Sequence, residues 1–313
     1  MNFEKETLPN FLIVGAPRCG TTAMYNYLDR HPQIFMSPVK EPCFFSLPAM
    51  KFPHKGIEDD VWERSLVTNL KDYKSLFAGA KNEVRRGEAS PDYLFRYETA
   101  IPGIRELLGD ITIIIMVRNP VDRAFSAYWL LRKLQREHLS FEEALEQEQS
   151  RIDDNYSYIW HYQRLGHYSQ AIMAYQQEFS TVGVFLFEDF KREPTKHLCR
   201  VYQLLNVNPE FQQSVATVYN ASGEVTSPLL FAFLTQSNPV KAALKPVVDL
   251  AFPETKRRHL IEDWKSRLVV MPKMKTETRR RLISLYRDDI LKFQELIGRD
   301  LRHWLEEDDD GNE

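Results

Sequence analysis

Hydrophobic runs and helical periods alternate along the first two thirds of the chain. Apolar residues dominate Phe11–Gly15, Ile111–Val117 and Val182–Phe187, and the second of these runs is apolar apart from Thr112 and rich in β-branched side chains. Such runs are typical of parallel strands that are covered on both faces. Helical periodicity extends between and after them, over residues 21–28, 100–108, 121–136, 168–178 and 194–205. This alternation predicts an α/β protein with a three-layer fold, in which helices flank a central parallel sheet.

The C-terminal third has a different pattern. Periodicity weakens over residues 206–228, which we expect to form a long loop or lid, and the clearest helix after it is Thr276–Ile297. No internal repeat or low-complexity linker divides the chain. We therefore expect a single domain over residues 1–305, followed by a solvated, disordered acidic tail over residues 306–313.

Composition excludes several classes of protein. The 313 residues are 43% hydrophobic, which excludes a disordered or collagenous chain. Six of the 44 acidic residues lie in Glu306–Glu313, so the 41 basic residues leave the rest with a charge of only +3, too little to indicate nucleic-acid binding. The three cysteines are widely spaced without a CxxC pair, which favours a reducing compartment over a disulfide framework or zinc ribbon. With no apolar stretch of about 18 residues, we expect a soluble, cytoplasmic protein without a membrane span.

A glycine-containing loop follows the first apolar run. Gly15 and Gly20 have the spacing of a P-loop, whose backbone N–H groups and helix N-terminus surround a phosphate. Thr21 occupies the position of the usual lysine, however, and the cation is Arg18 instead. The strand over 111–117 ends in Arg118, where a nucleotide triphosphatase needs a carboxylate to hold Mg²⁺. The loop therefore predicts a metal-free cradle for phosphate or sulfate, and the alternative is a glycine turn without a ligand.

A second anion-binding pattern, RNPVDRAFS, begins at Arg118. Asn119-Pro120 turns the chain and starts a helix, which places Ser126 about two turns along it. Ligands of open α/β sheets bind at the carboxyl ends of the strands. We therefore expect Arg118 and Ser126 to bind a second phosphate, well separated from the first, with a structural salt bridge as the alternative for Arg118. Arg123 is a further candidate for this second site, but a surface ion pair is the interpretation we favour for it.

Together, the two motifs resemble those of the sulfotransferases that use 3′-phosphoadenosine 5′-phosphosulfate (PAPS), in particular bacterial members and the heparan-sulfate-type enzymes. The resemblance extends over most of the chain through His31-Pro32, Lys40–Phe45 (KEPCFF), Gly87–Tyr93 (GEASPDY) and a closing pattern from Tyr286 to Trp304. It implies transfer of a sulfuryl group from PAPS to the hydroxyl of a glycan, a lipid, a carrier-bound acyl chain or a small metabolite. The nucleotide product is 3′,5′-adenosine bisphosphate (PAP), and no metal takes part.

The resemblance also assigns roles to individual residues. It makes Glu41 the general base and Arg18 the cation that stabilises the leaving phosphate; from the sequence alone, Glu41 is more simply a solvent-exposed partner of Lys40. It assigns nucleotide binding to Arg18, Cys19, Gly20, Thr21, Thr22, Arg118 and Ser126, and to Ser222 and Gly223 in the lid. The chain departs from the family pattern at Cys43, usually His, and at Ala89, where some glycan sulfotransferases carry a lysine.

Two other classes of function remain open at this stage. A P-loop kinase shares the loop, but the chain lacks its lysine and a clear acid for the metal; a non-catalytic nucleotide-binding protein has no use for Glu41. The histidines show no metal-ligand spacing, so we expect no metal site. Further candidates for acceptor contacts are three aromatic residues, for which core packing is the default, and two basic clusters, for which a solvated helix face is the default: Trp160, Tyr162, Tyr168, Lys256–His259 and Arg279–Arg281.

Overall fold

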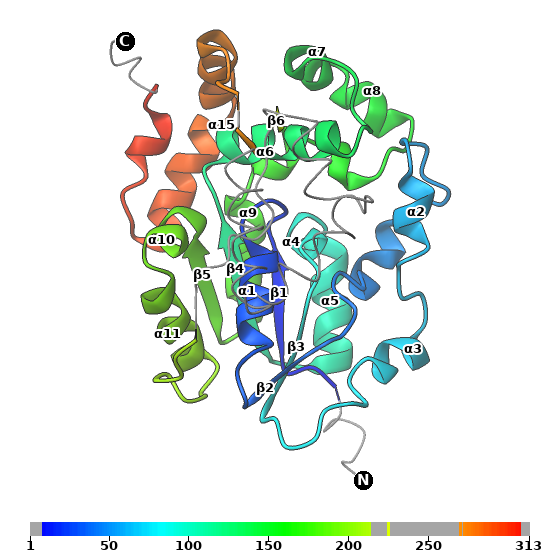
Figure 1. Cartoon of the computed structure of the whole chain (residues 1–313), viewed down its shortest axis with the longest axis vertical. Coiled ribbons are helices and arrows are strands. Elements are labelled where there is room, and N and C mark those ends of the chain that lie inside the picture. The colour runs from blue at the N-terminus through cyan, green and yellow to red at the C-terminus, as the bar shows by residue number, and fades with distance from the viewer. Residues whose placement is uncertain (1–7, 214–223, 226–268, 271, 308–313) are drawn as a thin grey trace, which may run out of the picture.

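A five-stranded parallel sheet forms the centre of the structure, a computed structural model that describes residues 8–213, 224–225, 269–270 and 272–307 (Figure 1). The strand order is β2-β3-β1-β4-β5, and every neighbouring pair is parallel. The strands are β1 (Phe11–Gly15), β2 (Ile34–Met36), β3 (Arg85–Ala89), β4 (Thr112–Val117) and β5 (Val182–Leu186). The predicted α/β fold with a central parallel sheet is confirmed.

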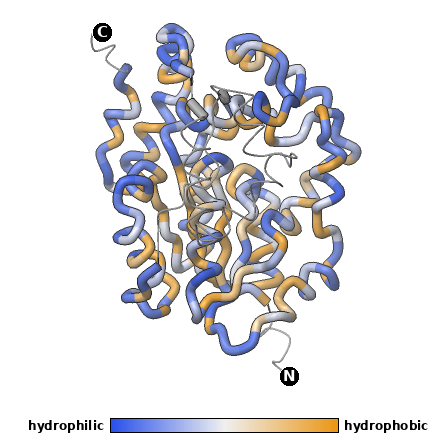
Figure 2. The backbone as a smooth tube through the Cα atoms, in the orientation of Figure 1, coloured by the Kyte–Doolittle hydropathy of each residue, from blue (hydrophilic) through white to orange (hydrophobic). Residues whose placement is uncertain are grey.

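The middle strands are dry on both faces. Every residue of β1 and β4 is buried, as their unbroken apolar runs predict. Hydrophobic residues accordingly concentrate along the centre of the molecule and polar ones on the outer helices (Figure 2). Burial of their side chains holds these two strands in the core and thereby positions the loops that follow them.

Helices cover both faces of the sheet. The β1-to-β2 and β3-to-β4 connections run in opposite directions across the sheet, so right-handed crossovers place their helices on opposite faces. One face carries α1 (Thr21–Leu28), α10 (Phe187–Arg192) and α11 (Pro194–Leu204). The other face carries α4 (Asp92–Phe95), α5 (Tyr97–Leu108) and α9 (Ser169–Glu178). In Figure 1, α1 lies in front of the sheet and α9 behind it.

The remaining elements surround this core. They are the helices α2 (Asp59–Glu63), α3 (Leu70–Ser75), α6 (Pro120–Lys133), α7 (Phe141–Glu146), α8 (Glu148–Asp153) and α15 (Thr276–Ile297). Short 3₁₀ turns occur at Phe44–Ala49, Tyr158–Trp160, Arg164–Gly166 and Arg302–Leu305, and a two-stranded antiparallel pair joins β6 (Glu224–Val225) to β7 (Val269–Val270). None of the helices in the described ranges combines the length and the apolar character needed to cross a membrane.

The C-terminal helix α15 packs on the site side of the core. Its Asp289 accepts hydrogen bonds from the backbone N–H groups of Tyr168 (2.7 Å) and Ser169 (3.2 Å). The Tyr286 hydroxyl donates to the backbone oxygen of Gln163 at 2.9 Å. The C-terminal helix therefore positions the 163–169 segment, which lies beside the glycine loop.

Candidate active site

The two predicted anion motifs lie at the same edge of the sheet. The glycine loop follows β1 and Arg118 follows β4, and these strands are neighbours. Glu41 joins them from a segment that packs on the end of β3, where its N–H donates to the backbone oxygen of Ala89 at 3.0 Å. Because parallel strands end at one edge, motifs from distant parts of the sequence converge there.

Backbone hydrogen bonds hold the loop in a tight turn. The N–H of Ala16 donates to the backbone oxygen of Met116 at 2.5 Å, and the N–H of Cys19 donates to the backbone oxygen of Ala16 at 3.2 Å. Gly20 ends the turn with φ of 85°, a conformation that favours glycine. A Cβ atom there would lie 2.7 Å from Cδ2 of Phe187, so the position excludes a side chain on steric grounds as well.

The loop leads into α1, whose first-turn backbone N–H groups have no capping side chain. Gly20 is the N-cap of α1 and has no side chain to cap the first-turn N–H groups, which have no acceptor within the helix. Thr21 and Thr22 begin that turn, and Thr21 is buried. The Cys19 side chain points away from this region: its Sγ lies 3.9 Å from the Tyr168 hydroxyl, and burial raises the pKa of the thiol to about 12. An uncapped helix N-terminus beside a cation is a binding site for an anion.

Arg18 links the two motifs directly. It has φ of 68°, and its Nε and Nη2 atoms both donate to Ser126 Oγ at 3.3 Å, across 108 residues of sequence. The sequence predicts two well-separated contacts, whereas one arginine side chain spans from the loop to α6. Burial, and then the positive charge of Arg118, lower the pKa of Arg18 to about 10. Two guanidinium groups held close together favour a negatively charged ligand between them.

Arg118 is held by an aromatic ring and by its own backbone. Its Cζ lies 5.0 Å from the centroid of the Phe187 ring, and its backbone oxygen accepts from the Tyr168 hydroxyl at 3.0 Å. In the described part of the chain, no carboxylate lies within salt-bridge distance of Arg118, so the alternative of a structural salt bridge is wrong there. Glu188 supports the turn instead, by accepting the backbone N–H of Asn119 at 2.9 Å.

Arg123 corrects a sequence prediction. It is fully buried, and its Nη2 donates to the backbone oxygen of Tyr162, so it is not in a surface ion pair. Its Nε and Nη1 atoms are buried without a hydrogen-bond partner in the described residues. The helical period explains the difference, since Arg123 lies one turn before Ser126 on the inner face of α6. The surface ion pair at this end of α6 belongs to Asp122, which binds Arg279 at 2.9 Å.

Glu41 lies beyond the end of β3, in a left-handed backbone conformation with φ of 64°. Its carboxylate forms an ion pair with Lys40, and 30% of its side chain is exposed. The negative charge of Glu41 counteracts the lowering of the Arg18 pKa, which places the carboxylate within electrostatic range of the loop cation. Glu41 thus pairs with Lys40, as the sequence suggests, and also lies within electrostatic range of Arg18.

Two buried acids support the Glu41 segment, and sequence analysis missed their role. Ser90 Oγ donates to Glu88 at 2.8 Å and accepts the backbone N–H of Cys43 at 3.1 Å. Ser46 Oγ donates to Asp92. Burial raises the pKa of Glu88 to about 8, so this carboxyl is mostly protonated at neutral pH. The signal was present in the sequence as acidic residues inside the short, otherwise uncharged segment GEASPDY.

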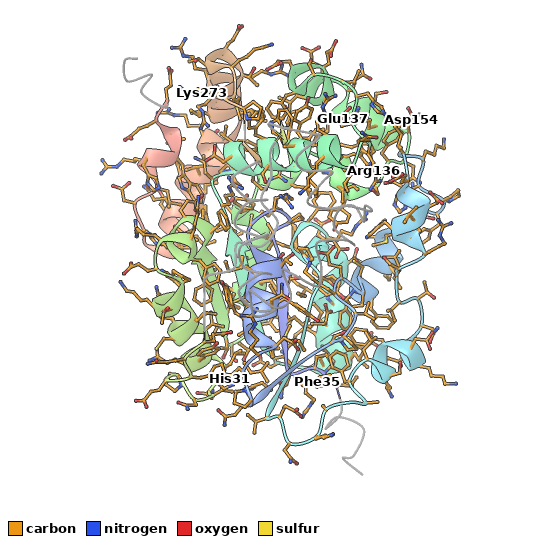
Figure 3. All side chains as sticks on the ribbon, viewed as in Figure 1. His31, Phe35, Arg136, Glu137, Asp154 and Lys273 are labelled. Carbon is orange, nitrogen blue, oxygen red and sulfur yellow. The ribbon has the colours of Figure 1, made fainter. Side chains whose placement is uncertain are left out.

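The His31-Pro32 pair, which is part of the family resemblance, lies outside this site. His31 and Phe35 lie at the opposite end of the molecule from α6 (Figure 3). The His31 ring packs 4.6 Å from the Tyr202 ring and 4.8 Å from the Phe211 ring, measured between centroids. This part of the pattern stabilises the fold.

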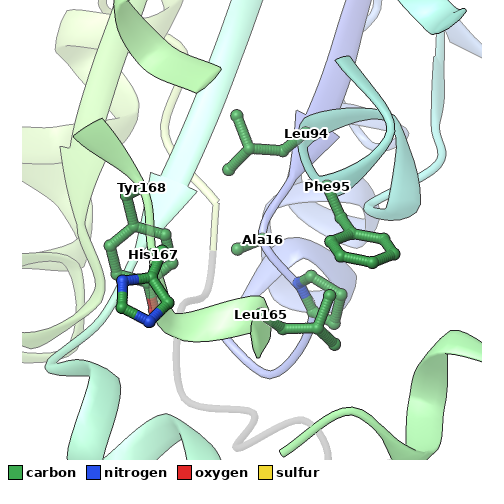
Figure 4. Close-up of a pocket in the computed structure, with 7 residues that line it drawn as sticks. Ala16, Leu94, Phe95, Leu165, His167 and Tyr168 are labelled. Carbon is green, nitrogen blue, oxygen red and sulfur yellow. The ribbon is translucent and has the colours of Figure 1, made fainter. Parts of the chain in front are cut away.

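One of the three candidate aromatic residues reaches a pocket. Trp160 donates to buried Asp59 and Tyr162 to buried Glu137, so both belong to the core. Tyr168 contributes to a small pocket against the glycine loop (Figure 4). The residues that line it are Ala16, Pro17, Leu94, Phe95, Leu165, His167 and Tyr168.

The other candidates fall into two groups. Ser222, Gly223 and the cluster Lys256–His259 lie outside the described residues. Arg280 and Arg281 form exposed ion pairs with Glu307 and Glu146, as expected for a solvated helix face.

The sheet and the site define a P-loop-like protein with a positively charged anion-binding site at the carboxyl ends of the strands. A family profile described as "Sulfotransferase family" matches residues 9–212, about two thirds of the chain. The chain belongs to the sulfotransferase family. The matched range covers the sheet, both anion motifs and Glu41.

Individual relatives agree with this assignment. A sulfotransferase structure from Alicyclobacillus acidocaldarius is similar with a TM-score of 0.76 and 30% identity, covering 95% of this chain and 99% of that one. The membrane-associated sulfotransferase kil1 of Dictyostelium discoideum is 34% identical over 148 residues, which are 44% of this chain and 28% of that protein. The heparan sulfate glucosamine 3-O-sulfotransferase 3B1 of Mus musculus is 28% identical over 205 residues, 64% of this chain and 46% of that protein. The matches thus span less than half the length of these curated relatives.

Proposed function

We propose that the protein transfers a sulfuryl group from PAPS to the hydroxyl of an acceptor and releases PAP. One observation carries the proposal: Arg18 in the loop reaches Ser126 of the second motif, with Arg118 beside them, at the uncapped N-terminus of α1. PAPS carries anionic groups at both its 5′ and 3′ positions, and this edge of the sheet offers cations and backbone donors for two such groups.

In this proposal, each of the two motifs binds a different part of PAPS. The N–H groups at the start of α1, the Thr21 and Thr22 hydroxyls and Arg18 bind the 5′-phosphosulfate. Arg118 and Ser126 bind the 3′-phosphate. Stacking on Phe187 keeps the Arg118 guanidinium in place before the nucleotide arrives, which reduces the entropy lost on binding.

Glu41 and Arg18 have separate roles in the proposed reaction. As the acceptor oxygen attacks sulfur, its proton passes to the Glu41 carboxylate. The bond between sulfur and the bridging oxygen breaks, and the negative charge that develops on the departing phosphate is stabilised by Arg18 and the first-turn N–H groups. Atoms balance as alcohol plus PAPS giving sulfate ester, PAP and the proton. The leaving group is held by fixed donors of the chain, so this route assigns no step to a metal.

Isothermal titration tests the proposal, with PAP in one experiment and ATP plus Mg²⁺ in another. We expect PAP to bind tightly without metal, and Arg118→Ala to weaken it about 10- to 100-fold, since it removes charge-assisted hydrogen bonds. Arg64→Ala is the matched control, because Arg64 is exposed directly after α2 and pairs only with Asp60 among the described residues. A preference for Mg-ATP would overturn the proposal in favour of a kinase.

A transfer assay separates an enzyme from a nucleotide-binding protein. Glu41→Gln is expected to bind PAP like the wild type and to lose turnover. A variant that keeps full turnover removes Glu41 from the mechanism, while the donor assignment stands on the titration.

A further inference from the structure

The peptide group between Arg118 and Asn119 is held at both ends by side chains. Its oxygen accepts from the Tyr168 hydroxyl at 3.0 Å, and its N–H donates to the Glu188 carboxylate at 2.9 Å. Tyr168 directly precedes α9 and Glu188 belongs to α10, so the two side chains come from opposite faces of the sheet. Arg118 follows the last residue of β4, beyond the pairing of β4 with β5. Side chains therefore orient this peptide group where the strand pairing has ended.

Tyr168 is itself held firmly. Its side chain is 1% exposed, and its ring packs edge-on against Phe293 of α15, with 6.1 Å between the centroids. Its N–H donates to Asp289 at 2.7 Å. A phenol has one proton to donate, and the oxygen of Arg118 accepts it, whereas Cys19 Sγ is farther away at 3.9 Å. The ring thus lies between β4 and the glycine loop with its hydroxyl fixed on Arg118 (Figure 4).

The direction of the Arg118 side chain depends on this peptide group. The guanidinium lies 5.0 Å from the centroid of the Phe187 ring, a contact that holds it by charge and carries no hydrogen bond. In the described ranges, no carboxylate reaches Arg118 within salt-bridge distance. The ring therefore limits how far the guanidinium moves, and the fixed backbone of Arg118 sets the direction in which the side chain leaves the strand.

We infer that Tyr168 is a positioning residue for Arg118, and that its buried hydroxyl raises the affinity of the site for the 3′-phosphate of the nucleotide. This inference rests on the proposed function, because it takes Arg118 as the contact of that phosphate. Tyr168 acts through the backbone oxygen of Arg118 and has no contact with the nucleotide. A guanidinium that is oriented before binding loses less entropy when it forms its hydrogen bonds to phosphate.

Two nucleotides that differ only in the 3′-phosphate test the inference: PAP and adenosine 5′-phosphate. Each is titrated into the full wild-type chain and into Tyr168→Phe, which keeps the ring and removes the hydroxyl. We expect Tyr168→Phe to weaken PAP binding about 3- to 10-fold and to change the affinity for adenosine 5′-phosphate by less than about twofold. Equal weakening of both nucleotides, or no weakening of PAP, overturns the inference.

Tyr175→Phe is the matched control. Tyr175 lies on the same helix α9 and is fully buried, and its hydroxyl donates to the backbone oxygen of Tyr93 at 3.1 Å. Both variants lose a bond from a buried phenol to a backbone oxygen, so we expect both to lower the melting temperature by similar amounts. The preference for PAP over adenosine 5′-phosphate should fall only in Tyr168→Phe. An equal fall in Tyr175→Phe would mean a general loosening of the fold and would overturn the inference.

A double-mutant cycle tests whether the effect passes through Arg118. In the Arg118→Ala background, Tyr168→Phe is expected to weaken PAP binding by less than about twofold further, because the guanidinium that it positions is gone. Losses that multiply in the double variant show that Tyr168 acts by another route and overturn the inference.

The wild type separates this inference from the proposed function. Its affinities for PAP and adenosine 5′-phosphate are measured first. A wild type without a preference for PAP refutes the proposed 3′-phosphate site and the inference built on it. A wild-type preference that persists unchanged in Tyr168→Phe refutes the role of Tyr168 alone and leaves the proposed function intact.

Discussion

The two sides of the proposed site carry different groups and are built by different means. The donor side, formed by the loops after β1 and β4, gathers Arg18, Arg118 and buried Arg123. The base side, formed on the end of β3, gathers Glu41 above buried Glu88 and Asp92. Positive groups thus gather on the side of the proposed leaving phosphate, and the proposed proton acceptor, Glu41, lies on the other side.

The two sides differ in what holds their backbone in place. Both sides contain residues with positive φ, at Arg18 and Gly20 on the donor side and at Glu41 and Cys43 on the base side. Backbone hydrogen bonds stabilise the loop, whereas side chains of buried acids and serines hold the Glu41 segment. The donor side therefore depends on backbone shape, and the base side on a buried side-chain network.

The largest effect on turnover is expected from a substitution of Glu41. Glu41→Gln keeps the size of the side chain and removes the proton acceptor, so kcat should fall about 10²- to 10⁴-fold. PAP affinity, measured by titration, should stay within about twofold, since the donor side is untouched. A parallel loss of PAP affinity contradicts the division into two sides.

The next effect tests the buried network through pH. Burial raises the pKa of Glu88 from 4.5 to about 8, so between these values the folded protein holds a proton that the unfolded chain has released. Its contribution to stability is complete below pH 4.5 and is lost as pH rises toward 8, at up to about 1.4 kcal/mol per pH unit. Chemical denaturation at several pH values should show this decline in the wild type and a flatter profile in Glu88→Gln. Identical slopes in both proteins mean that Glu88 is ionised in the folded state.

A smaller effect tests the backbone dependence of the loop. Gly20→Ala meets both a positive φ and the Phe187 ring, so it should lower the free energy of unfolding by about 1–3 kcal/mol and weaken PAP binding. Gly298→Ala is the matched control, because Gly298 is also in the left-handed region, with φ of 62° and ψ of 38°, and has nothing within 4 Å of a Cβ. The difference between the two variants is the contribution of the clash. Equal destabilisation by both, with unchanged PAP binding, refutes a specific role for Gly20.

The smallest effect is expected far from the proposed site, on α15. Arg281 lies 3.8 Å from Glu146, and both side chains are more than half exposed. Arg281→Gln should therefore change the free energy of unfolding by less than about 0.5 kcal/mol and leave transfer to any acceptor unchanged. A selective loss of activity toward an acidic acceptor would reassign this helix face to substrate binding.

The sequence predicts the donor side well and the base side poorly. The apolar runs that become β1 and β4 locate the loops after them, and α1 and α15 begin and end where their patterns predict. β3 is missed because Arg85, Arg86 and Gly87 conceal it: the two arginines lie near the start of the strand and donate to the backbone oxygens of Leu205 and Leu8. A strand of five residues with charges at its start has no period that a sequence pattern can show.

The same limit applies to individual site residues. Arg18, Arg118 and Ser126 are found because their motifs are continuous in sequence. The burial of Arg123 and the hydrogen bond from Tyr168 to Arg118 depend on tertiary contacts between segments far apart in the chain. Local patterns carry no information on such pairings.

The link from Asp289 to Tyr168 and Ser169 has a consequence for the order of folding. These hydrogen bonds join residues 120 and 121 positions apart, so the pocket wall receives its support only after α15 has been synthesised and has docked. Gly20 and Arg118, in contrast, lie against Phe187, which precedes α15 by a long stretch of chain. During synthesis these contacts can thus form before the 163–169 segment is fixed, and contacts of such long range are slow to close. We expect a folding intermediate with a formed sheet to bind PAP before the 163–169 segment is fixed.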